Sequence, residues 1–303
     1  MQLQIALKEF LTSLRALNRA DATIEWYGHM LNAYVDWLTA TGRNGADLVR
    51  PATIETFLDA ERQHVKKSTV AARYRALRPF YKWMKRRGYL GDHPNPFESL
   101  KEPKSPKGHM PRQASPEQVA ELLASIGDDD WLALRDAALV LMLAHAGLRL
   151  SEVTALRIEH LDLDECMVHV VEAKGDKQRL VPFGVALCKS VRAYIDACPA
   201  FESGTKPKMW LWWGSDGWQG VRKPLKSKGL QEMLQRRCEA AGMDNLNPHS
   251  FRHGYALMML EKGADISFVA DLLGHESVET TRDFYLKWQK GRKKALFQRI
   301  WGD

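Results

Sequence analysis

The sequence is poor in cysteine, and none of its cysteines falls in a CxxC pair. The four residues are Cys166, Cys188, Cys198 and Cys238, and their spacing predicts neither a zinc ribbon nor a redox dithiol. The chain also lacks a G-x-x-x-x-G-K-[ST] loop for nucleotide phosphates and an HExxH zinc motif. The sequence therefore shows no motif for a zinc ribbon, a redox dithiol, a zinc protease or a nucleotide-binding loop, and we expect no cofactor from the chemistry derived below.

Long apolar runs are absent as well. No stretch of about 18 apolar residues occurs, which is the length that a membrane-spanning helix needs. The first residues, Met1–Lys8, lack the layout of a signal peptide. We therefore expect a soluble, cytoplasmic protein without a membrane partner. The 303 residues suffice for two domains, and a hydrophobic content of 45% is enough for packed cores.

Negative charge is scarce in one part of the chain only. Residues 1–110 hold 18 Lys and Arg against 11 Asp and Glu, whereas residues 111–303 hold 26 of each. The formal net charge of +7 is therefore all N-terminal. This asymmetry favours a polyanion, most simply nucleic acid, as the partner of the first domain. The alternative is that an excess of this size on so long a chain has no function.

The first hundred residues have the pattern of a helical domain. Periodic apolar residues predict four helices, over 3–17, over 21–38, from Pro51 onward and over 68–87. The fourth is strongly basic, because residues 66–87 contain nine Lys and Arg and no acid. Such a helical face is either merely solvated or in contact with phosphates, and its single sign of charge favours phosphates. The candidate contacts are Lys66, Lys67, Arg73, Arg75, Arg78, Lys82 and Lys85.

A segment rich in proline, lysine and small residues follows, and it has no apolar period. It contains Pro103, Pro106 and Gly108 together with four charged residues. Such a composition is typical of a linker. We therefore predict an N-terminal domain over 1–100, a linker over 101–111 and a second domain over 112–303.

The second domain is predicted to be mostly helical at its start. Ser115 and Pro116 form an N-cap and first-turn pair. The nearly apolar stretch 131–146 predicts a buried helix, which Gly147 should end. Residues 210–218 hold four tryptophans, to which the pattern assigns no function.

Two strands and a last group of helices complete this domain. The strands, over 166–171 and 179–183, are expected to pair across a turn that carries Lys174. Near the C-terminus, Asp265 should cap a helix that ends before Gly274.

Six polar residues stand between short apolar blocks of this domain. Taken singly, each has an ordinary explanation, such as a capping arginine paired with Glu152, a solvated turn lysine or a core aromatic. His249 and His253 also have the spacing of a helical metal pair, but no third ligand is evident nearby. The six residues are Arg149, Lys174, His249, Arg252, His275 and Tyr285.

Together and in this order, the six residues resemble the tyrosine recombinase (phage integrase) family, which includes the chromosome-dimer-resolving recombinases of bacteria. The resemblance in motifs, among them Leu272-Leu273-Gly274-His275, covers about residues 112–290. It implies a mainly α, α+β fold, with a helical N-terminal DNA-binding domain and a mostly helical catalytic domain that contains a small antiparallel sheet. It also implies site-specific recombination of double-stranded DNA by a homo-tetramer, or by a hetero-tetramer with a related recombinase.

The residue types fit that chemistry. The guanidiniums of Arg149 and Arg252 can clamp the oxygens of a phosphodiester while charge builds on them. Tyr285 is the candidate nucleophile, which in the family forms a 3′-phosphotyrosine. Lys174 is the candidate acid for the departing 5′-oxygen, and His249 and His275 are candidates for assisting proton transfer. The phosphotyrosine conserves the bond energy, so the reaction needs neither metal nor ATP.

The position of the tyrosine departs from the family pattern. Many members carry the nucleophile nine residues after the histidine of the Leu-Leu-Gly-His motif, where this chain has Phe284. Tyr285 comes tenth after His275, and a one-residue insertion in the connecting turn would absorb the difference. The nearest competitor, Tyr255, is expected to lie in the core.

Two rival functions are also compatible with this sequence. A type IB topoisomerase uses similar chemistry but relaxes supercoils without pairing two sites. A DNA-binding protein without chemistry is the other, although the complete set of six side chains disfavours it.

The tail over 288–303 has an apolar edge at helical spacing. A helix so short must dock to be stable, either on its own domain or, as in the recombinases that it resembles, on the neighbouring protomer. The residues of this edge are Leu296, Phe297, Ile300 and Trp301.

Overall fold

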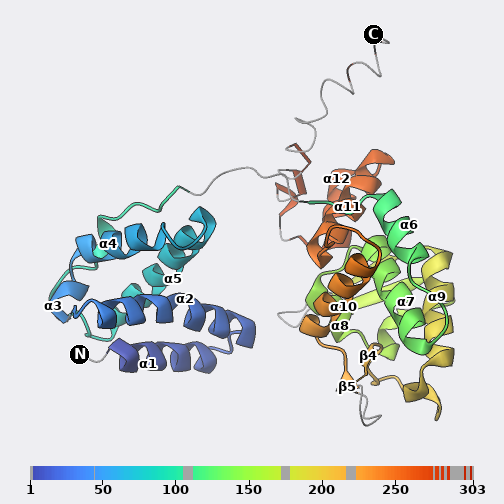
Figure 1. Cartoon of the computed structure of the whole chain (residues 1–303), viewed down its shortest axis with the longest axis horizontal. Coiled ribbons are helices and arrows are strands. Elements are labelled where there is room, and N and C mark those ends of the chain that lie inside the picture. Colours follow the sequence, from blue (N-terminus) through green and yellow to red (C-terminus); the bar gives the residue numbers. More distant parts are fainter. Residues whose placement is uncertain are drawn as a thin grey trace. The chain divides into compact units, whose positions relative to one another are not determined.

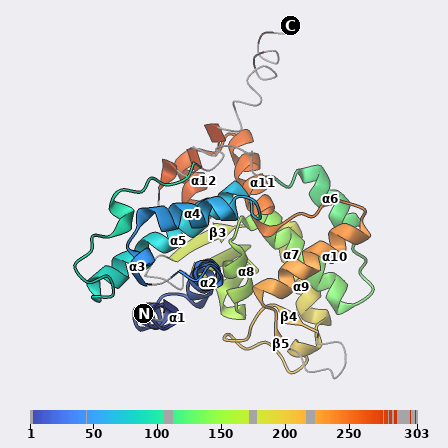
Figure 2. The same ribbon diagram turned by 60° about the vertical axis from the view of Figure 1, so that its left-hand side comes forward.

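A computed structural model gives the fold of the chain (Figures 1 and 2). It describes residues 3–43, 45–104, 112–171, 178–215, 223–275, 277–279, 281–282, 285–286, 297 and 301. The chain divides into two compact units, Met1–His109 and Met110–Asp303. Each unit has its own hydrophobic core, and the division falls within the predicted linker.

The described part of the first unit is helical. Its elements are α1 (Leu3–Ala16), α2 (Asp21–Ala40), α3 (Gly45–Leu48), α4 (Pro51–Glu61), α5 (Lys67–Arg86) and the short 3-10 helix η1 (Pro96–Glu98). Helix α5 packs against α1, α2 and α4 (Figure 1). Large aromatic side chains fill this contact, and the buried hydroxyls of Tyr34 and Tyr81 share a hydrogen bond of 2.7 Å. The other face of α5 keeps Arg75, Arg78 and Lys82 exposed.

The second unit is also mainly helical, so the predicted fold class is confirmed. Its helices are α6 (Pro116–Ala124), α7 (Trp131–Ala146), α8 (Leu150–Ala155), α9 (Val185–Ala197), α10 (Ser227–Ala240), α11 (Pro248–Glu261) and α12 (Ile266–Leu273). Its shorter elements are η2 (Ile158–His160), η3 (Pro199–Phe201), β1 (Leu161–Asp162), β2 (Met167–Val171), β3 (Gln178–Pro182), β4 (Trp213–Gly214) and β5 (Lys223–Pro224). The β4–β5 pair lies at the end of this unit away from α12 (Figures 1 and 2).

Helix α7 forms the centre of the second core, as its apolar sequence predicted. It packs against α6, α9 and α11 (Figure 1). Gly147 ends it in the left-handed conformation, with φ of 60°. A Cβ on Gly147 would collide with the ring of Tyr255, so glycine also permits close packing on α11. The predicted Ser115 and Asp265 caps are confirmed, since their side chains accept the N–H groups of Gln118 and Ser267.

The predicted hairpin is confirmed, and a third strand that the pattern missed extends it. The antiparallel sheet has the order β1-β2-β3, with Val170 opposite Arg179. The tip of the β2–β3 hairpin, residues 172–177, lies outside the described residues, and Lys174 with it.

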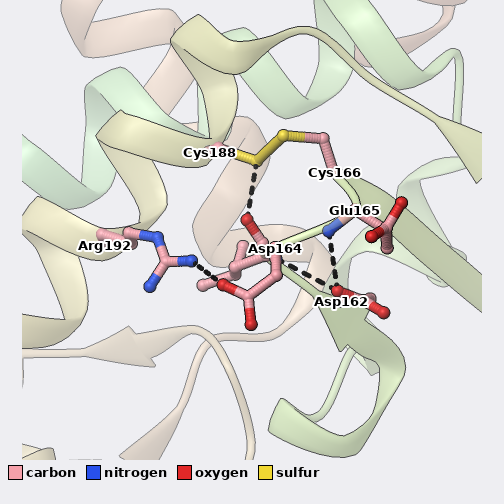
Figure 3. Close-up of a disulfide and its surroundings, with 7 residues drawn as sticks. Asp162, Asp164, Glu165, Cys166, Cys188 and Arg192 are labelled. Atoms are coloured by element: carbon pink, nitrogen blue, oxygen red, sulfur yellow. Dashed lines mark hydrogen bonds and ion pairs between the residues drawn. A yellow bond between two sulfur atoms is a disulfide. The ribbon is translucent and has the colours of Figure 1, made fainter.

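A disulfide joins Cys166 to Cys188, which the cysteine spacing did not predict (Figure 3). Cys166 is the last residue of the β1–β2 turn, where the Asp162 carboxylate accepts the N–H groups of Asp164 and Glu165 at 3.0 and 2.9 Å. Cys188 lies on α9, so the bond fastens this turn to the helix. Crosslinks that close loops of this size stabilise a fold by about 3 kcal/mol.

Two tryptophans of the 210–218 segment have a structural role, while Trp218 lies outside the described residues. Trp212 is fully buried and stacks on Tyr194, while the carbonyl of Trp213 accepts a hydrogen bond from buried Arg135 at 2.8 Å. Within the part of the chain that the structure describes, no helix has the length and apolar character required to cross a bilayer.

Candidate active site

One pocket of the second unit collects four of the six predicted catalytic residues. Arg149 reaches it from the N-cap of α8, His249 and Arg252 from one face of α11, and His275 from the turn after α12. The remaining lining residues are Leu148, Leu150, Ser151, Ser227, Gln231, Asn247 and Pro248. Segments separated by more than 100 residues therefore meet here.

The side chain of Arg149 is anchored and still partly open, with 37% of it exposed. Its backbone N–H and its Nη1 both donate to the carboxylate of Glu152, each at 2.7 Å. Its Nη2 donates to the carbonyl of Gly274. The ion pair with Glu152 that the sequence suggested as the ordinary explanation is thus present, and it orients the guanidinium at the pocket.

Arg252 is more deeply placed, with only 5% of the residue exposed. Its Nη1 donates to the carbonyl of Gly147 at 2.8 Å, and its Nη2 donates to the carbonyl of Leu273 at 2.5 Å. The guanidinium therefore ties the end of α7 to the end of α12. A buried arginine held by two carbonyls has little rotational freedom.

The two histidines of the pocket have lowered pKa values. Burial, followed by the neighbouring cations Arg252, Arg149 and Arg179, lowers the pKa of His275 to about 4. Burial and then Arg252 also lower the pKa of His249. Both imidazoles are therefore neutral near pH 7. The Nδ1 of His275 lies 2.7 Å from the hydroxyl of buried Thr281, which fixes the ring.

His253, considered from the sequence only as a metal ligand paired with His249, lies edge-on against His249 with ring centroids 4.3 Å apart. Burial lowers its pKa to about 4, assisted by His249, Arg252 and His275. The ring is therefore neutral near pH 7, and it contacts His249 without being part of the pocket lining.

The basic helix α5 bears a polar groove in the first unit. Its lining is Arg78, Lys82, Lys85, Arg86, Asn95, Phe97 and Glu98. Lys66 and Lys67 are exposed at the N-terminal end of α5, and Arg75 forms a loose ion pair with Glu102 at 3.6 Å.

Arg73 requires a correction. Its guanidinium pairs with Glu61 and lies over the ring of Phe57, and only 12% of its side chain is exposed. The helical periodicity could not reveal this pairing, because Glu61 lies on a different helix. Arg73 therefore stabilises the helical unit from within and is unsuited to a phosphate contact.

Comparison with known proteins decides the family. Residues 113–292 match the phage integrase family, and residues 7–88 match the phage integrase N-terminal SAM-like domain. The chain belongs to the phage integrase family. It is a tyrosine-type site-specific recombinase, an enzyme that breaks and rejoins DNA. This assignment favours recombination over the type IB topoisomerase alternative.

Relatives of this recombinase match along most of its length. The tyrosine recombinase XerC of Xanthomonas campestris pv. campestris (strain B100) is 30% identical over 280 residues, covering 91% of this chain and 82% of the relative. XerC of Salmonella typhi is 31% identical over 262 residues, covering 86% and 83%. Among solved structures, a lambda integrase(75-356) dimer bound to a COC' core site has a TM-score of 0.68 at 16% identity, covering 94% and 95%. XerH bound to a palindromic difH substrate, in a post-cleavage complex, has a TM-score of 0.68 at 17% identity, covering 98% and 84%. The two structural matches show a shared fold.

Two predicted catalytic residues of the recombinase are not in the described lining of the pocket. Lys174 lies outside the described residues. Tyr285 is half-buried and has helical backbone geometry. Its neighbour Phe284 lies outside the residues that the structure describes. The competitor Tyr255 is buried, and burial raises the pKa of its phenol. The core position predicted for Tyr255 is therefore confirmed.

Sequence reasoning missed four polar residues of the pocket, namely Ser151, Ser227, Gln231 and Asn247. Asn247 is also the N-cap of α11, accepting the N–H of Ser250 at 3.0 Å. Its position before Pro248 was a usable signal for such a cap. Ser227 and Gln231 lie one turn apart on α10, which no local pattern distinguishes from an ordinary polar helix face.

Proposed function

We propose that this recombinase cleaves DNA through attack by Tyr285, which leaves a 3′-phosphotyrosine. The observation that carries the proposal is the convergence of Arg149, His249, Arg252 and His275 on one pocket. Two fixed cations and two neutral imidazoles suit a phosphodiester, whose phosphoryl oxygens gain charge as the nucleophile approaches.

The proposed step balances as a simple displacement. The phenolic oxygen of Tyr285 forms a bond to phosphorus, and the bond from phosphorus to the 5′-oxygen breaks. Arg149 and Arg252 stabilise the added charge on the phosphoryl oxygens, and Lys174 gives a proton to the departing oxygen. A 5′-hydroxyl from a second strand reverses the same step and releases the tyrosine.

The histidines would serve as neutral hydrogen-bonding groups in this scheme. A neutral imidazole has one donor and one acceptor nitrogen. Because Nδ1 of His275 lies against Thr281, its Nε2 is the atom suited to the phosphate. His249, one turn before Arg252 on α11, would accept the proton of the attacking phenol or return it.

The proposal is tested with a nicked substrate, on which cleavage releases a short fragment and traps the covalent product. The wild-type protein should form a stable protein–DNA adduct on a denaturing gel, and the adduct should persist in excess EDTA. Because arginine side chains stabilise the charge on the phosphoryl oxygens, removal of divalent ions should leave the rate of cleavage unchanged. Strict dependence on a divalent ion would reject this mechanism, and the absence of any adduct would favour the binding-only alternative.

We further propose that the groove of α5 contacts the DNA backbone through Arg78, Lys82 and Lys85. Replacing these three residues by alanine should weaken DNA binding and lower the salt slope of the affinity by up to about three units, since each phosphate contact contributes about 0.9. Filter binding or anisotropy at several salt concentrations measures the slope.

A matched control removes the same charge from another helix of the first unit and the residues just after it. Lys8, Arg15 and Arg19 are exposed on or just after α1. Their triple alanine variant should keep a slope close to that of the wild type. Equal losses in the two variants would mean that only the net charge of the unit matters.

We also propose that protomers assemble into a tetramer on paired sites through the C-terminal tail. Phe297 and Trp301 stack with ring centroids 6.1 Å apart, yet they are 60% and 71% exposed. Two exposed aromatics one helical turn apart are suited to burial against a second protomer. Whether the partner is a second copy or a related recombinase is decided by mixing experiments on asymmetric sites.

Truncation after Gly291 should leave binding to a single half-site intact and remove cooperative binding to a full site. The double substitution Phe297→Ser and Trp301→Ser should have the same effect, because it removes the apolar contact alone. Leu17→Ser, at an equally exposed position on the first unit, is the control. Gel-shift titrations on half and full sites measure the cooperativity, and unchanged cooperativity in both tail variants would place the tail on its own protomer.

A further inference from the structure

Arg179, on β3, lies next to the catalytic pocket but outside its lining. Only 12% of its side chain is exposed. Its Nη1 and Nη2 donate to the two carboxylate oxygens of Glu152 at 3.1 and 2.7 Å. Its Nε donates to the carbonyl of Leu272 at 2.8 Å. The guanidinium therefore bridges the start of α8 and the end of α12.

Glu152 is shared between two arginines. Each of its carboxylate oxygens accepts one hydrogen bond from Arg149 and one from Arg179. Only 7% of the Glu152 side chain is exposed. Burial would raise the pKa of this carboxyl, but the hydrogen bonds from Arg179 and Arg149 outweigh burial and lower it. A buried carboxylate with two cations remains ionised and has few alternative positions.

Arginines also hold the last three carbonyls of the α12 segment. The donors are Arg179 to Leu272, Arg252 to Leu273 and Arg149 to Gly274. These carbonyls carry the negative end of the helix dipole, which favours cations. Gly274 has φ of 65°, and a Cβ there would lie 2.7 Å from Nη1 of Arg179. The turn that presents His275 is thus built directly against Arg179.

We infer that Arg179 is a positioning residue of the recombinase, which holds Arg149 through Glu152 and holds His275 through the end of α12. This role rests on the proposed chemistry at the pocket. Arg179 donates to both carboxylate oxygens of Glu152 and so holds that carboxylate in the position where it binds Arg149. Because Arg179 also donates to the carbonyl of Leu272, it fixes the distance between the start of α8 and the end of α12. Loss of Arg179 should slow cleavage without weakening DNA binding, because the group acts through residues that contact the phosphate.

The first test compares Arg179→Met and Arg179→Lys with the wild type in single-turnover cleavage of the nicked substrate at saturating protein. Both variants should be slower by roughly 10²-fold, as expected for a small displacement of reacting groups. Lysine should not rescue the rate, because an ammonium cannot bind two carboxylate oxygens and a carbonyl in one plane. Half-site affinity should stay within about twofold, since Arg179 is outside the lining.

Arg192→Met is the matched control. Arg192 is a half-exposed arginine on α9 that pairs with Asp164 at 2.6 Å (Figure 3) and is not part of the pocket lining. It should cleave at the wild-type rate. Thermal melting accompanies each variant, and if Arg179→Met is unfolded at the assay temperature, Arg179→Lys carries the test.

A double-mutant cycle tests the connection through Glu152. The variants are Glu152→Gln, Arg179→Met and the two combined. If Arg179 acts through Glu152, the combined loss of rate should be much smaller than the product of the two single losses. Independent, multiplicative losses would overturn this connection.

Titration of His275 by NMR gives a readout that loss of folding stability does not move. The groups that act on its charge are Arg252, Arg149, Arg179, His249 and His253. Removing the Arg179 cation should raise the pKa of His275 above its value of about 4 in the wild type. An unchanged pKa of His275 in Arg179→Met, together with wild-type cleavage in both Arg179 variants, would reject the positioning role and leave the proposed chemistry intact. Failure of the wild type to form an adduct would instead reject the proposed chemistry, and this role with it.

Discussion

Substitution of Tyr285 by phenylalanine should abolish the covalent protein–DNA adduct while leaving DNA binding close to that of the wild type. The phenolic oxygen is the proposed attacking atom, and phenylalanine removes that atom while keeping the ring. No other protein group in the proposed scheme forms a bond to phosphorus, so the loss should be complete within the sensitivity of the gel. The nicked substrate, resolved under denaturing conditions, measures it.

Tyr255→Phe is the matched control for this prediction. It makes the same chemical change at a buried position on α11, where Tyr255 packs against Gly147. This variant should still form the adduct. An adduct that survives in Tyr285→Phe but disappears in Tyr255→Phe would reassign the nucleophile. It would also mean that the tenth position after His275 is not where the family's tyrosine lies in this chain.

Short sequence patterns correctly predicted the helix ends and caps, because these depend only on neighbouring residues. Gly147 and Gly274 end helices in left-handed conformations, a backbone geometry that glycine adopts without strain. Asp265 caps α12 because its carboxylate accepts backbone N–H groups near the helix start. Such features depend on a few neighbouring residues, so a pattern within ten residues suffices to find them.

The contacts that organise the pocket could not be predicted in the same way. The hydrogen bond from Arg149 to Gly274 spans 125 residues, and that from Arg179 to Leu272 spans 93. They depend on the register of β3 with β2 and on how α12 packs against the strand. The sequence placed Arg179 at the start of a strand, but it gave no sign that its side chain points toward Glu152.

The same limit explains the error at Arg73. A helical wheel assigns a residue to a face, but it does not identify the acid that faces it from another helix. Glu61, the last residue of α4, neutralises Arg73 within the unit. Arg78 and Lys82 lie on the exposed face of the same helix, and for them the charge pattern remains the best guide.

Replacing either of the two arginines proposed to clamp the phosphate should lower the rate of cleavage by about 10²-fold or more, since removal of one donor to a developing oxyanion costs that much. The measurement is single-turnover cleavage of prebound nicked DNA, which separates the chemical step from binding. Arg149→Ala and Arg252→Ala should both retain half-site binding within an order of magnitude, because phosphates elsewhere on the site supply most of the affinity.

The two arginines should differ in their effect on folding. Arg252→Ala leaves the carbonyls of Gly147 and Leu273 without the donors that Arg252 supplies, and each buried group left unsatisfied costs about 1–3 kcal/mol. Arg149 is far more exposed, and Glu152 would still have Arg179 as a partner in Arg149→Ala. Thermal melting should therefore show the larger destabilisation for Arg252→Ala, and cleavage is compared at a temperature where both variants are folded.

Arg252→Lys separates charge from geometry at the same position. An ammonium keeps the positive charge but is unable to donate to Gly147, Leu273 and a phosphate from one planar group. If the fork of donors is what stabilises the transition state, Arg252→Lys should remain close to Arg252→Ala in rate while recovering part of the lost stability. Wild-type cleavage by Arg252→Lys would show that a positive charge alone is sufficient, and the proposed clamp of two oriented guanidiniums would then have to be abandoned.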